Sequence, residues 1–311
     1  MRAPLKMIEL LRAKEKRPPC SDKKKASFLE FEKVSLSVSS ENYLQENSFD
    51  AFVCGSDQVW NLDMPGMSEL FFLRFAPQGK RIAYAPSFGM ASVPRYNRRK
   101  LKKCLDEIPW VSVREASGVV IVEEVTGRKV PQVLDPVLLA RPDFWGDADS
   151  QRDDILVCYF LSECSAHFEE IRRLACDRGL RIVWVEAGSP AIKESEVRAP
   201  SPMEFVDLIK NASYVCTDSF HGLAFSLIFK TPYSVFDRAY ESNAQQATRI
   251  DSLLSLVGAD ATQSGACRSS DALSFEEAGE LLAVERRRSL SYLSAALNEA
   301  TGGDCDGGRV S

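Results

Sequence analysis

The feature that most constrains the fold is a repeated alternation of short, continuously apolar runs with segments of helix length. Strands buried on both faces of a parallel sheet have unbroken apolar sequences, whereas strands with one solvated face alternate apolar and polar residues. The alternation therefore predicts an α/β fold with parallel sheets. The expected strands are residues 51–54, 81–85, 110–113, 130–134, 155–161, 180–186, 214–217 and 233–236, and the expected helices are 94–108, 116–125, 166–178, 202–212, 219–229 and 274–298.

A polar stretch at residues 146–154 interrupts the alternation, which restarts after it. Such a break is typical of a hinge between lobes. Residues 1–26 are basic and irregular and are expected to form a solvated arm. The predicted division is a basic arm and connector (1–45), an N-terminal Rossmann-like lobe (46–150), a C-terminal Rossmann-like lobe (151–262), a helical segment (263–298) and a disordered tail (299–311).

Composition limits the kind of partner and the kind of site. The 311 residues carry a formal net charge of −5, so overall charge suggests neither a nucleic acid nor an anionic membrane as partner, and an anion site has to be local. The longest apolar runs fall short of a membrane span and the N-terminus lacks an apolar signal core, which favours a cytoplasmic protein. The nine cysteines form no CxxC pair and there are only two histidines, so we expect reduced core cysteines and no metal site.

Three turns at the ends of the first-lobe strands carry polar groups. Gly55, Ser56 and Asp57 follow one strand, Ser87 follows the next, and Arg114 ends a third. Ligands gather at the carboxyl ends of strands in open α/β sheets, and an arginine there can hold a carboxylate or phosphate by two hydrogen bonds. The structural alternatives are a turn that only caps a helix and an arginine that only forms a salt bridge.

The strongest single motif runs between a second-lobe strand and an apolar helix. Asp218 and Ser219 occupy helix-capping positions, and His221, followed by Gly222, falls in the first turn. Unpaired amide groups and the helix dipole favour an anion at this position. His167 lies in a polar helical segment and is expected at the surface. The structural alternative for His221 is a buried core imidazole.

Taken in order, several motifs resemble the polysaccharide pyruvyl transferase family over residues 46 to about 240. The resemblance implies a glycosyltransferase-B-like pair of Rossmann-type lobes, with phosphoenolpyruvate as donor and a saccharide or lipid-linked saccharide as acceptor. The donor and the acceptor would meet between the lobes. The motifs are GSDQVWN (55–61), YAPSFG (84–89), VREASG (113–118), LDPVLL (134–139) and the segment 201–232 that contains TDSFHG.

The resemblance also implies roles for these residues. Arg114 would grip the donor's carboxylate or phosphate, His221 would bind an anion or act as acid or base, and Asp57 would be the third catalytic group. No cofactor beyond the donor substrate and no metal is implied. The residues expected to bind substrate are Gly55, Ser56, Ser87, Asp218, Ser219 and Gly222.

The N-terminal segment departs from the family pattern. The family's additional opening strand and helix are not recognisable in residues 1–47, so the first lobe is expected to be shortened and to expose a sheet edge. Two alternatives therefore stay open. One is a two-lobed glycosyltransferase that uses a nucleotide sugar, with Glu204 near the place for a ribose-binding carboxylate. The other is a truncated, inactive homologue that binds a glycan or a partner chain. The sequence also leaves homo-oligomerisation open.

Overall fold

The computed structural model describes residues 21–35, 49–62, 69–146, 152–238, 247–259 and 267–302. These residues form two compact units, each with its own sheet. The three-stranded unit takes its described residues from 39–144, 242–261 and 273–311, and the six-stranded unit takes them from 1–38, 145–241 and 262–272. Residue 145 is one of several places where the chain passes from one unit to the other, so each unit is assembled from separate stretches of sequence.

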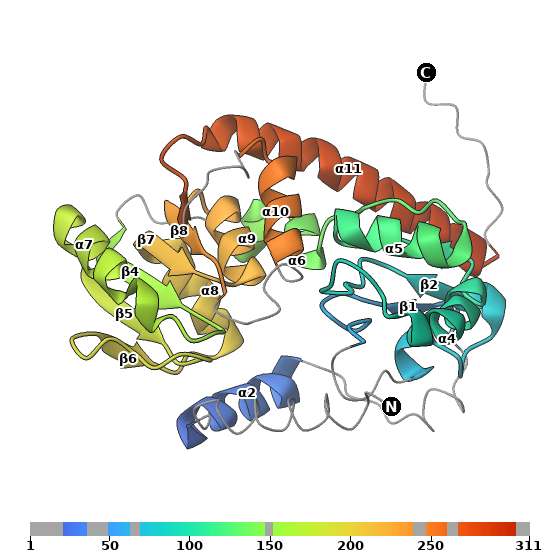
Figure 1. Cartoon of the computed structure of the whole chain (residues 1–311), viewed down its shortest axis with the longest axis horizontal. Helices are drawn as coiled ribbons and strands as arrows, with labels where there is room; N and C mark the ends of the chain where they lie inside the picture. The colour runs from blue at the N-terminus through green and yellow to red at the C-terminus, as the bar shows by residue number, and fades with distance from the viewer. Residues whose placement is uncertain are drawn as a thin grey trace. The chain divides into compact units, whose positions relative to one another are not determined.

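The three-stranded unit (Figure 1) holds a parallel sheet in the order β1-β2-β3. Its register pairs Phe52 with Arg81 and Ile82 with Trp110. Its elements are β1 (Phe52–Cys54), η1 (Glu69–Phe72), η2 (Gln78–Lys80), β2 (Arg81–Ala83), α4 (Arg95–Asp106), β3 (Trp110–Val111), α5 (Ala116–Thr126), α6 (Pro136–Leu139), α10 (Ala247–Leu256) and α11 (Phe275–Ala300), and η3 (Pro142–Trp145) lies at the passage between units.

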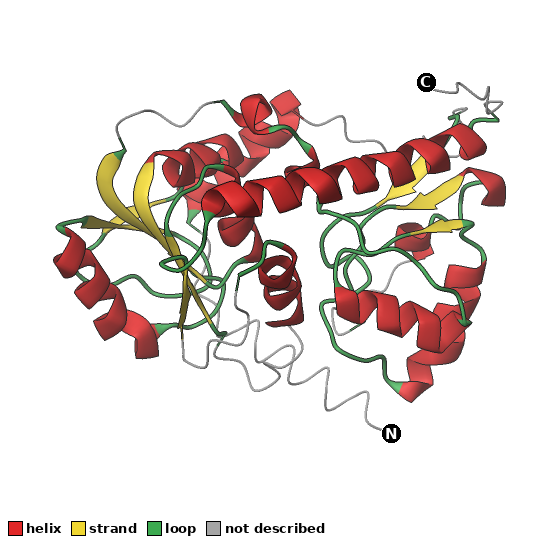
Figure 2. Cartoon of the chain, turned by 90° about the horizontal axis from the view of Figure 1, so that it is seen from above, coloured by secondary structure: helices red, strands yellow, loops and turns green. Residues whose placement is uncertain are grey.

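Helices cover both faces of this sheet. On one face, Ile82 packs with Ala296 and Ala300 of α11, and Tyr84 packs near Tyr292 of the same helix. On the other face, Ala83 joins the larger core under α4 and α5. Figures 1 and 2 show α11 and α4 on opposite sides of the strands. The predicted helix 274–298 is therefore part of this unit's core.

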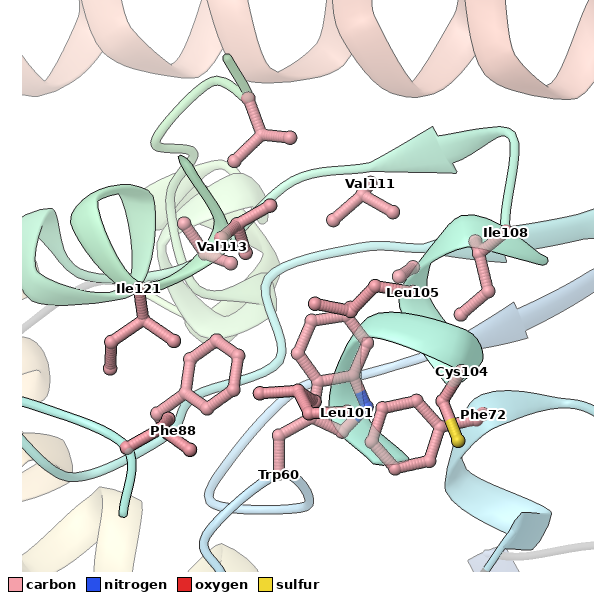
Figure 3. Packing of buried hydrophobic residues seen from close by; sticks show 14 of the residues in the cluster. Trp60, Phe72, Phe88, Leu101, Cys104, Leu105, Ile108, Val111, Val113 and Ile121 are labelled. Carbon is pink, nitrogen blue, oxygen red and sulfur yellow. The ribbon is translucent and has the colours of Figure 1, made fainter. Parts of the chain in front are cut away.

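Aromatic side chains fill the larger core of the three-stranded unit (Figure 3). The Trp60 ring stacks on Phe72, with a centroid separation of 5.3 Å and an interplanar angle of 7°. Its indole N–H donates to the Phe71 carbonyl at 3.0 Å, so the buried polar atom is satisfied. Leu101 and Leu105 of α4 complete the contact. This packing fixes Trp60 of the GSDQVWN motif and thereby the turn that precedes it.

The six-stranded unit has the strand order β6-β5-β4-β7-β8-β9, in which β9 alone is antiparallel. Consecutive residues Leu156, Val157 and Cys158 of the central strand are all fully buried, so both faces of the sheet are covered. Its elements are α2 (Asp22–Ser35), β4 (Asp153–Tyr159), η4 (Ser165–His167), α7 (Phe168–Arg178), β5 (Arg181–Val185), β6 (Glu196–Arg198), α8 (Pro202–Asn211), β7 (Ala212–Thr217), α9 (Phe220–Ile228), β8 (Tyr233–Phe236) and β9 (Cys267–Ser269).

Both units are mixed α/β structures with mainly parallel strands, which confirms the predicted class. The expected strand at 130–134 is wrong, because this segment makes only one isolated bridge, between Val113 and Gln132. Pro131 has no N–H with which to extend a ladder. The basic arm expected through residue 26 is helical and not irregular over its described part, where α2 begins at Asp22; its side chains there are exposed or half-buried. Strands β6 and β9 were not expected from the sequence.

Within the described ranges, no helix is both long enough and apolar enough to cross a lipid bilayer. The predicted disordered tail lies outside the described residues from 303 onward. Most of the predicted basic arm, residues 1–20, lies outside them as well.

Candidate active site

The turn after β1 is held tightly against the turn after β2. Gly55 has φ +141°, and a Cβ at this position would lie 1.7 Å from the Tyr84 carbonyl oxygen, so only glycine fits. Asp57 adopts φ +56°, which is uncommon for a residue with a side chain. The Ser87 amide donates to the Asp57 carbonyl at 2.7 Å. The two predicted motifs therefore form one joined structure at the carboxyl edge of the sheet.

Arg114 lies beneath this structure and binds two carboxylates. Its Nη1 is 2.5 Å from Asp135 Oδ2 and its Nη2 is 3.3 Å from Asp57 Oδ1. The Ser56 hydroxyl donates to the same Asp135 oxygen at 2.7 Å. The side chains of Arg114 and Asp135 are 1% and 2% exposed. In this arrangement Arg114 supports the turn that carries Ser56 and Asp57, and its guanidinium is already engaged by protein groups.

Asp57 is the solvent-facing member of the group. Its side chain is 66% exposed, while Arg114 and the buried Arg249 lie on its inner side, with Arg249 Nη1 3.8 Å away. Arg249 comes from α10, far along the chain. We call Ser56, Asp57, Arg114, Asp135 and Arg249 the Arg114 cluster. It presents the Asp57 carboxylate to solvent over two buried guanidinium groups, while the Ser56 hydroxyl is directed inward to Asp135.

Ser87 and its loop rest on a second buried acid. Ser87 is fully buried, and its hydroxyl donates to Glu115 Oε1 at 3.0 Å. The amides of Phe88 and Gly89 donate to the same oxygen. Burial is the main cause of a raised pKa at Glu115, although Arg114 and these hydrogen bonds oppose it. Ser87 thus fixes the loop from within and does not face solvent.

The six-stranded unit carries the other candidate group. Its strand order reverses between β4 and β7, and ligands bind at such a switch point in open α/β sheets. β7 leads directly to Ser219, which caps α9 by accepting a hydrogen bond from the Gly222 amide at 3.4 Å. His221 is partly exposed in the first turn of α9, beside the Phe220 ring. A histidine and a helix N-terminus are therefore presented at the carboxyl edge.

Gly222 allows this turn to pack closely. A Cβ here would lie 2.5 Å from Thr217 Oγ1. The Thr217 hydroxyl is fixed in place because it donates to the Tyr159 carbonyl at 2.7 Å and accepts from the Ser219 amide at 3.0 Å. Gly222 is buried, so its role in this structure is close packing.

Asp218 has an internal role. It is fully buried, and its carboxylate accepts hydrogen bonds from the amides of Leu161 and Ser162, at 2.7 and 2.9 Å. The Ser162 hydroxyl donates to it at 2.5 Å. Arg238, after β8, donates to the Asp218 carbonyl at 3.0 Å. Asp218 therefore ties the ends of β4, β7 and β8 together and supports the His221 turn from behind.

Two other sequence-based candidates are placed by the structure. Glu204 accepts the Ser201 amide at 2.7 Å in a capping box at the start of α8, so its carboxylate serves the helix end. His167 lies in η4, with its ring 4.9 Å from that of Phe236. In the part of the chain that the structure describes, no three His, Cys, Asp or Glu side chains gather as metal ligands.

The structure brings Ser56, Asp57 and Arg114 together, as their positions at strand ends indicated. Asp135 and Arg249 were not predicted as site residues from the sequence. Asp135 had a recognisable signal, since an aspartate before a proline is typical of a helix N-cap, and its Oδ1 accepts the Val137 amide at 3.1 Å. No sequence signal places Arg249 here, because its approach depends on the tertiary fold.

A family model described as polysaccharide pyruvyl transferase matches residues 6–239. This range contains every predicted site residue. It begins 40 residues before residue 46, where the resemblance was expected to begin, so the family match extends further toward the N-terminus than predicted. No curated protein matches the chain.

Proposed function

Because the chain belongs to the polysaccharide pyruvyl transferase family, we propose that it moves an enolpyruvyl unit from phosphoenolpyruvate to two hydroxyls of a saccharide, forming a pyruvate ketal. The observation that carries the proposal is the position of His221. It lies in the first turn of α9, at the switch point of a parallel sheet.

The reaction needs an acid, a base and an anion clamp. The methylene carbon of the donor gains a proton, and the adjacent carbon then accepts one sugar hydroxyl. The C–O bond to phosphate breaks, and the second hydroxyl closes the ketal. The two hydroxyl protons are accounted for, since one ends on the new methyl group and the other on the released phosphate.

The α9 turn suits the phosphate of the donor. The first amides of a helix and its dipole favour a dianion, and Ser219 holds the turn in shape. His221 is accessible enough to donate a proton to the donor or to the leaving phosphate. Gly222 and Asp218 contribute by fixing this turn.

The Arg114 cluster is suited to bind the sugar hydroxyl that adds to the donor. Asp57 is its exposed carboxylate and would accept a proton from a sugar hydroxyl, with Ser56 beside it as a hydrogen-bond partner. Arg114 would act by holding Asp57 and Ser56, or by gripping the donor's carboxylate if Asp57 moves aside. Gly55 and Ser87 would hold the backbone in place.

Three further features are proposed because they are implied by membership of the family. They are two Rossmann-like lobes in a glycosyltransferase-B-like arrangement, a polysaccharide or lipid-linked acceptor of exopolysaccharide synthesis, and a cytoplasmic location. The strand order of the six-stranded unit supports the first of these for that unit. Donor binding is proposed to need neither a cofactor nor a metal, and added chelator should leave it unchanged.

The test is thermal unfolding of the protein against increasing phosphoenolpyruvate, combined with phosphate release in the presence of saccharides. Ligand at about 100 times its dissociation constant adds roughly 2.7 kcal/mol of stability. A saturable rise in melting temperature is expected. In D₂O the methyl group of the product should carry deuterium, as protonation of the methylene carbon requires.

The chain offers a matched control, because His221 and His167 are its only histidines. His221→Ala should abolish the shift and phosphate release, while His167→Ala should keep both. Equal behaviour of the two variants would remove His221 from the site. A rise with nucleotide sugars but none with phosphoenolpyruvate would point to a glycosyltransferase, for which Glu204 is poorly placed because it caps α8.

A further inference from the structure

Helix α4 of the three-stranded unit carries an unusual concentration of positive charge. Six of its twelve residues are arginine or lysine, and Asp106 is its single acid. The buried residues Leu101, Cys104 and Leu105 attach one side of the helix to the core. Helical periodicity therefore directs the remaining side chains outward. The cations are Arg95, Arg98, Arg99, Lys100, Lys102 and Lys103.

The acids near this helix are already paired. Asp106 binds Lys102 at 2.9 Å and Glu124 binds Arg98 at 2.8 Å. Glu107, just after the helix, binds Arg74 at 2.9 Å and Arg81 at 3.2 Å. These three acids therefore do not neutralise the other cations of α4.

Four exposed cations of α4 form no ion pair with any described residue. Arg95, Arg99 and Lys103 follow one another at intervals of four residues, so they form a row along the helix. Lys100 lies beside this row. We call these four residues and Tyr96 the basic face of α4. The net charge of the whole chain is −5, so the basic face is a local feature of an acidic protein.

Tyr96 distinguishes this face from a merely solvated charged helix. Its side chain is 73% exposed, the largest exposure among the chain's described large hydrophobic residues. It lies one turn before Arg99 and Lys100, on the same side of the helix. An aromatic ring with a polar tip among cations suits the boundary between lipid headgroups and water.

We propose that the basic face of α4 binds the surface of a membrane that contains anionic phospholipids, with Tyr96 entering the headgroup layer. Clusters of four or more lysines and arginines on a helix are attracted to such surfaces. The acidic remainder of the protein does not prevent this, because at physiological salt charges beyond about 8 Å are largely screened. The binding needs no insertion of a spanning helix and goes beyond the proposed transferase function.

The test is co-sedimentation of the full chain with vesicles. One set consists of phosphatidylcholine alone and the other contains about one third phosphatidylglycerol, a proportion that gives the surface a negative potential. We expect binding to the anionic vesicles at low salt, little binding to the neutral ones, and release at about 0.5 M salt.

The variant that tests the surface replaces Arg95, Arg99, Lys100 and Lys103 by glutamine, which keeps helix propensity. Its partition onto anionic vesicles should fall by roughly several hundredfold, since each of the four cations contributes about fivefold near the surface. Tyr96→Ser should cause a smaller loss, because this substitution removes no charge. The double variant Arg99→Gln/Lys103→Gln gives a second measurement if the fourfold variant folds poorly.

A charge-matched control removes four cations from the six-stranded unit, of which one is half-buried and three are exposed. It replaces Arg172, Arg173, Arg181 and Lys193 by glutamine and has the same net charge as the test variant. It should bind vesicles as the unaltered chain does. Equal loss in both fourfold variants, equal binding to neutral vesicles, or no binding by the unaltered chain would overturn the proposal. Tighter binding to an RNA or an acidic polysaccharide than to anionic vesicles would also overturn it.

Discussion

Arg114 and Asp135 form an ion pair that is almost completely excluded from water, with 2.5 Å between Nη1 and Oδ2. Removing one partner of a buried pair leaves an uncompensated charge and costs about 3–5 kcal/mol. Asp135→Asn should therefore lower the free energy of unfolding by about 3 kcal/mol in urea denaturation. Because Asp135 also holds Ser56, the same variant should release less phosphate in the presence of saccharide.

The exposed pair of Arg141 and Asp143 is the control for this prediction. Its N–O distance is 3.0 Å, and its side chains are 80% and 61% exposed. Asp143→Asn should change the free energy of unfolding by less than about 1 kcal/mol, as is usual for surface pairs. Similar losses in the two variants would mean that Arg114 and Asp135 are not a buried pair in solution.

Glu115 should make stability depend on pH. Burial raises its pKa above the ordinary value, so the folded chain holds this proton more tightly than the unfolded chain. Its contribution to stability is therefore fully present below the unfolded pKa and is lost as pH rises through the folded pKa. Glu115→Gln carries no such charge, and its amide can keep the oxygen that Ser87, Phe88 and Gly89 bind.

The measurement is the melting temperature of the unaltered chain and of Glu115→Gln from pH 4 to pH 9. The stability of the variant relative to the unaltered chain should increase with pH. The geometry permits the substitution, because among the described residues Glu115 Oε2 has no hydrogen-bond partner that an amide nitrogen would displace. A pH-independent difference would show that Glu115 does not titrate in the expected direction.

Gly222 and Gly279 should respond to alanine in opposite ways. A methyl group at Gly222 would meet Thr217 at 2.5 Å, and hydrogen bonds hold the Thr217 side chain in place. Overpacking of this kind costs about 1–3 kcal/mol. At Gly279, in the exposed face of α11, a methyl group would meet no heavy atom of the described structure within 4 Å. Gly279→Ala should therefore raise stability by up to about 1 kcal/mol through helix propensity, as measured by thermal unfolding.

Asp218→Asn should be destabilising even without any ligand. The carboxylate accepts three hydrogen bonds from Leu161 and Ser162, and an amide nitrogen would face one or two of these donors. The expected cost is about 2–3 kcal/mol. Asp237→Asn is the control, because that side chain is 57% exposed and pairs only with Arg268 among the described residues. If Asp218→Asn kept full stability but lost donor binding, Asp218 would be a ligand-binding residue and not an anchor.

Local signals in the sequence determine the strands and the position of the site. Continuous apolar runs predicted the parallel strands, and the strand-end rule placed Ser56, Asp57 and Arg114 at one edge. The segment 130–134 has the same apolar character but failed as a strand, because Pro131 lacks the N–H that a ladder needs. Apolar character alone does not reveal how many hydrogen bonds a strand can make.

The partners of the site residues were harder to predict. Asp135, Arg249 and Glu115 reach Arg114, Asp57 and Ser87 only after distant segments pack together. A buried aspartate that anchors loops has the same local sequence as one that binds a ligand. The sequence therefore indicates that the site lies at the carboxyl edge of the sheet, but it does not show which of the polar side chains at that edge are buried and which face solvent.

The three-stranded unit takes its strands from early in the chain and a covering helix from near its end. Ile82 and Tyr84 depend on α11, which begins at Phe275. During synthesis on the ribosome, this face of the sheet must stay uncovered until α11 has been translated. A message truncated before codon 275 would yield a polypeptide with a bare sheet face, which we expect chaperones and proteases to recognise.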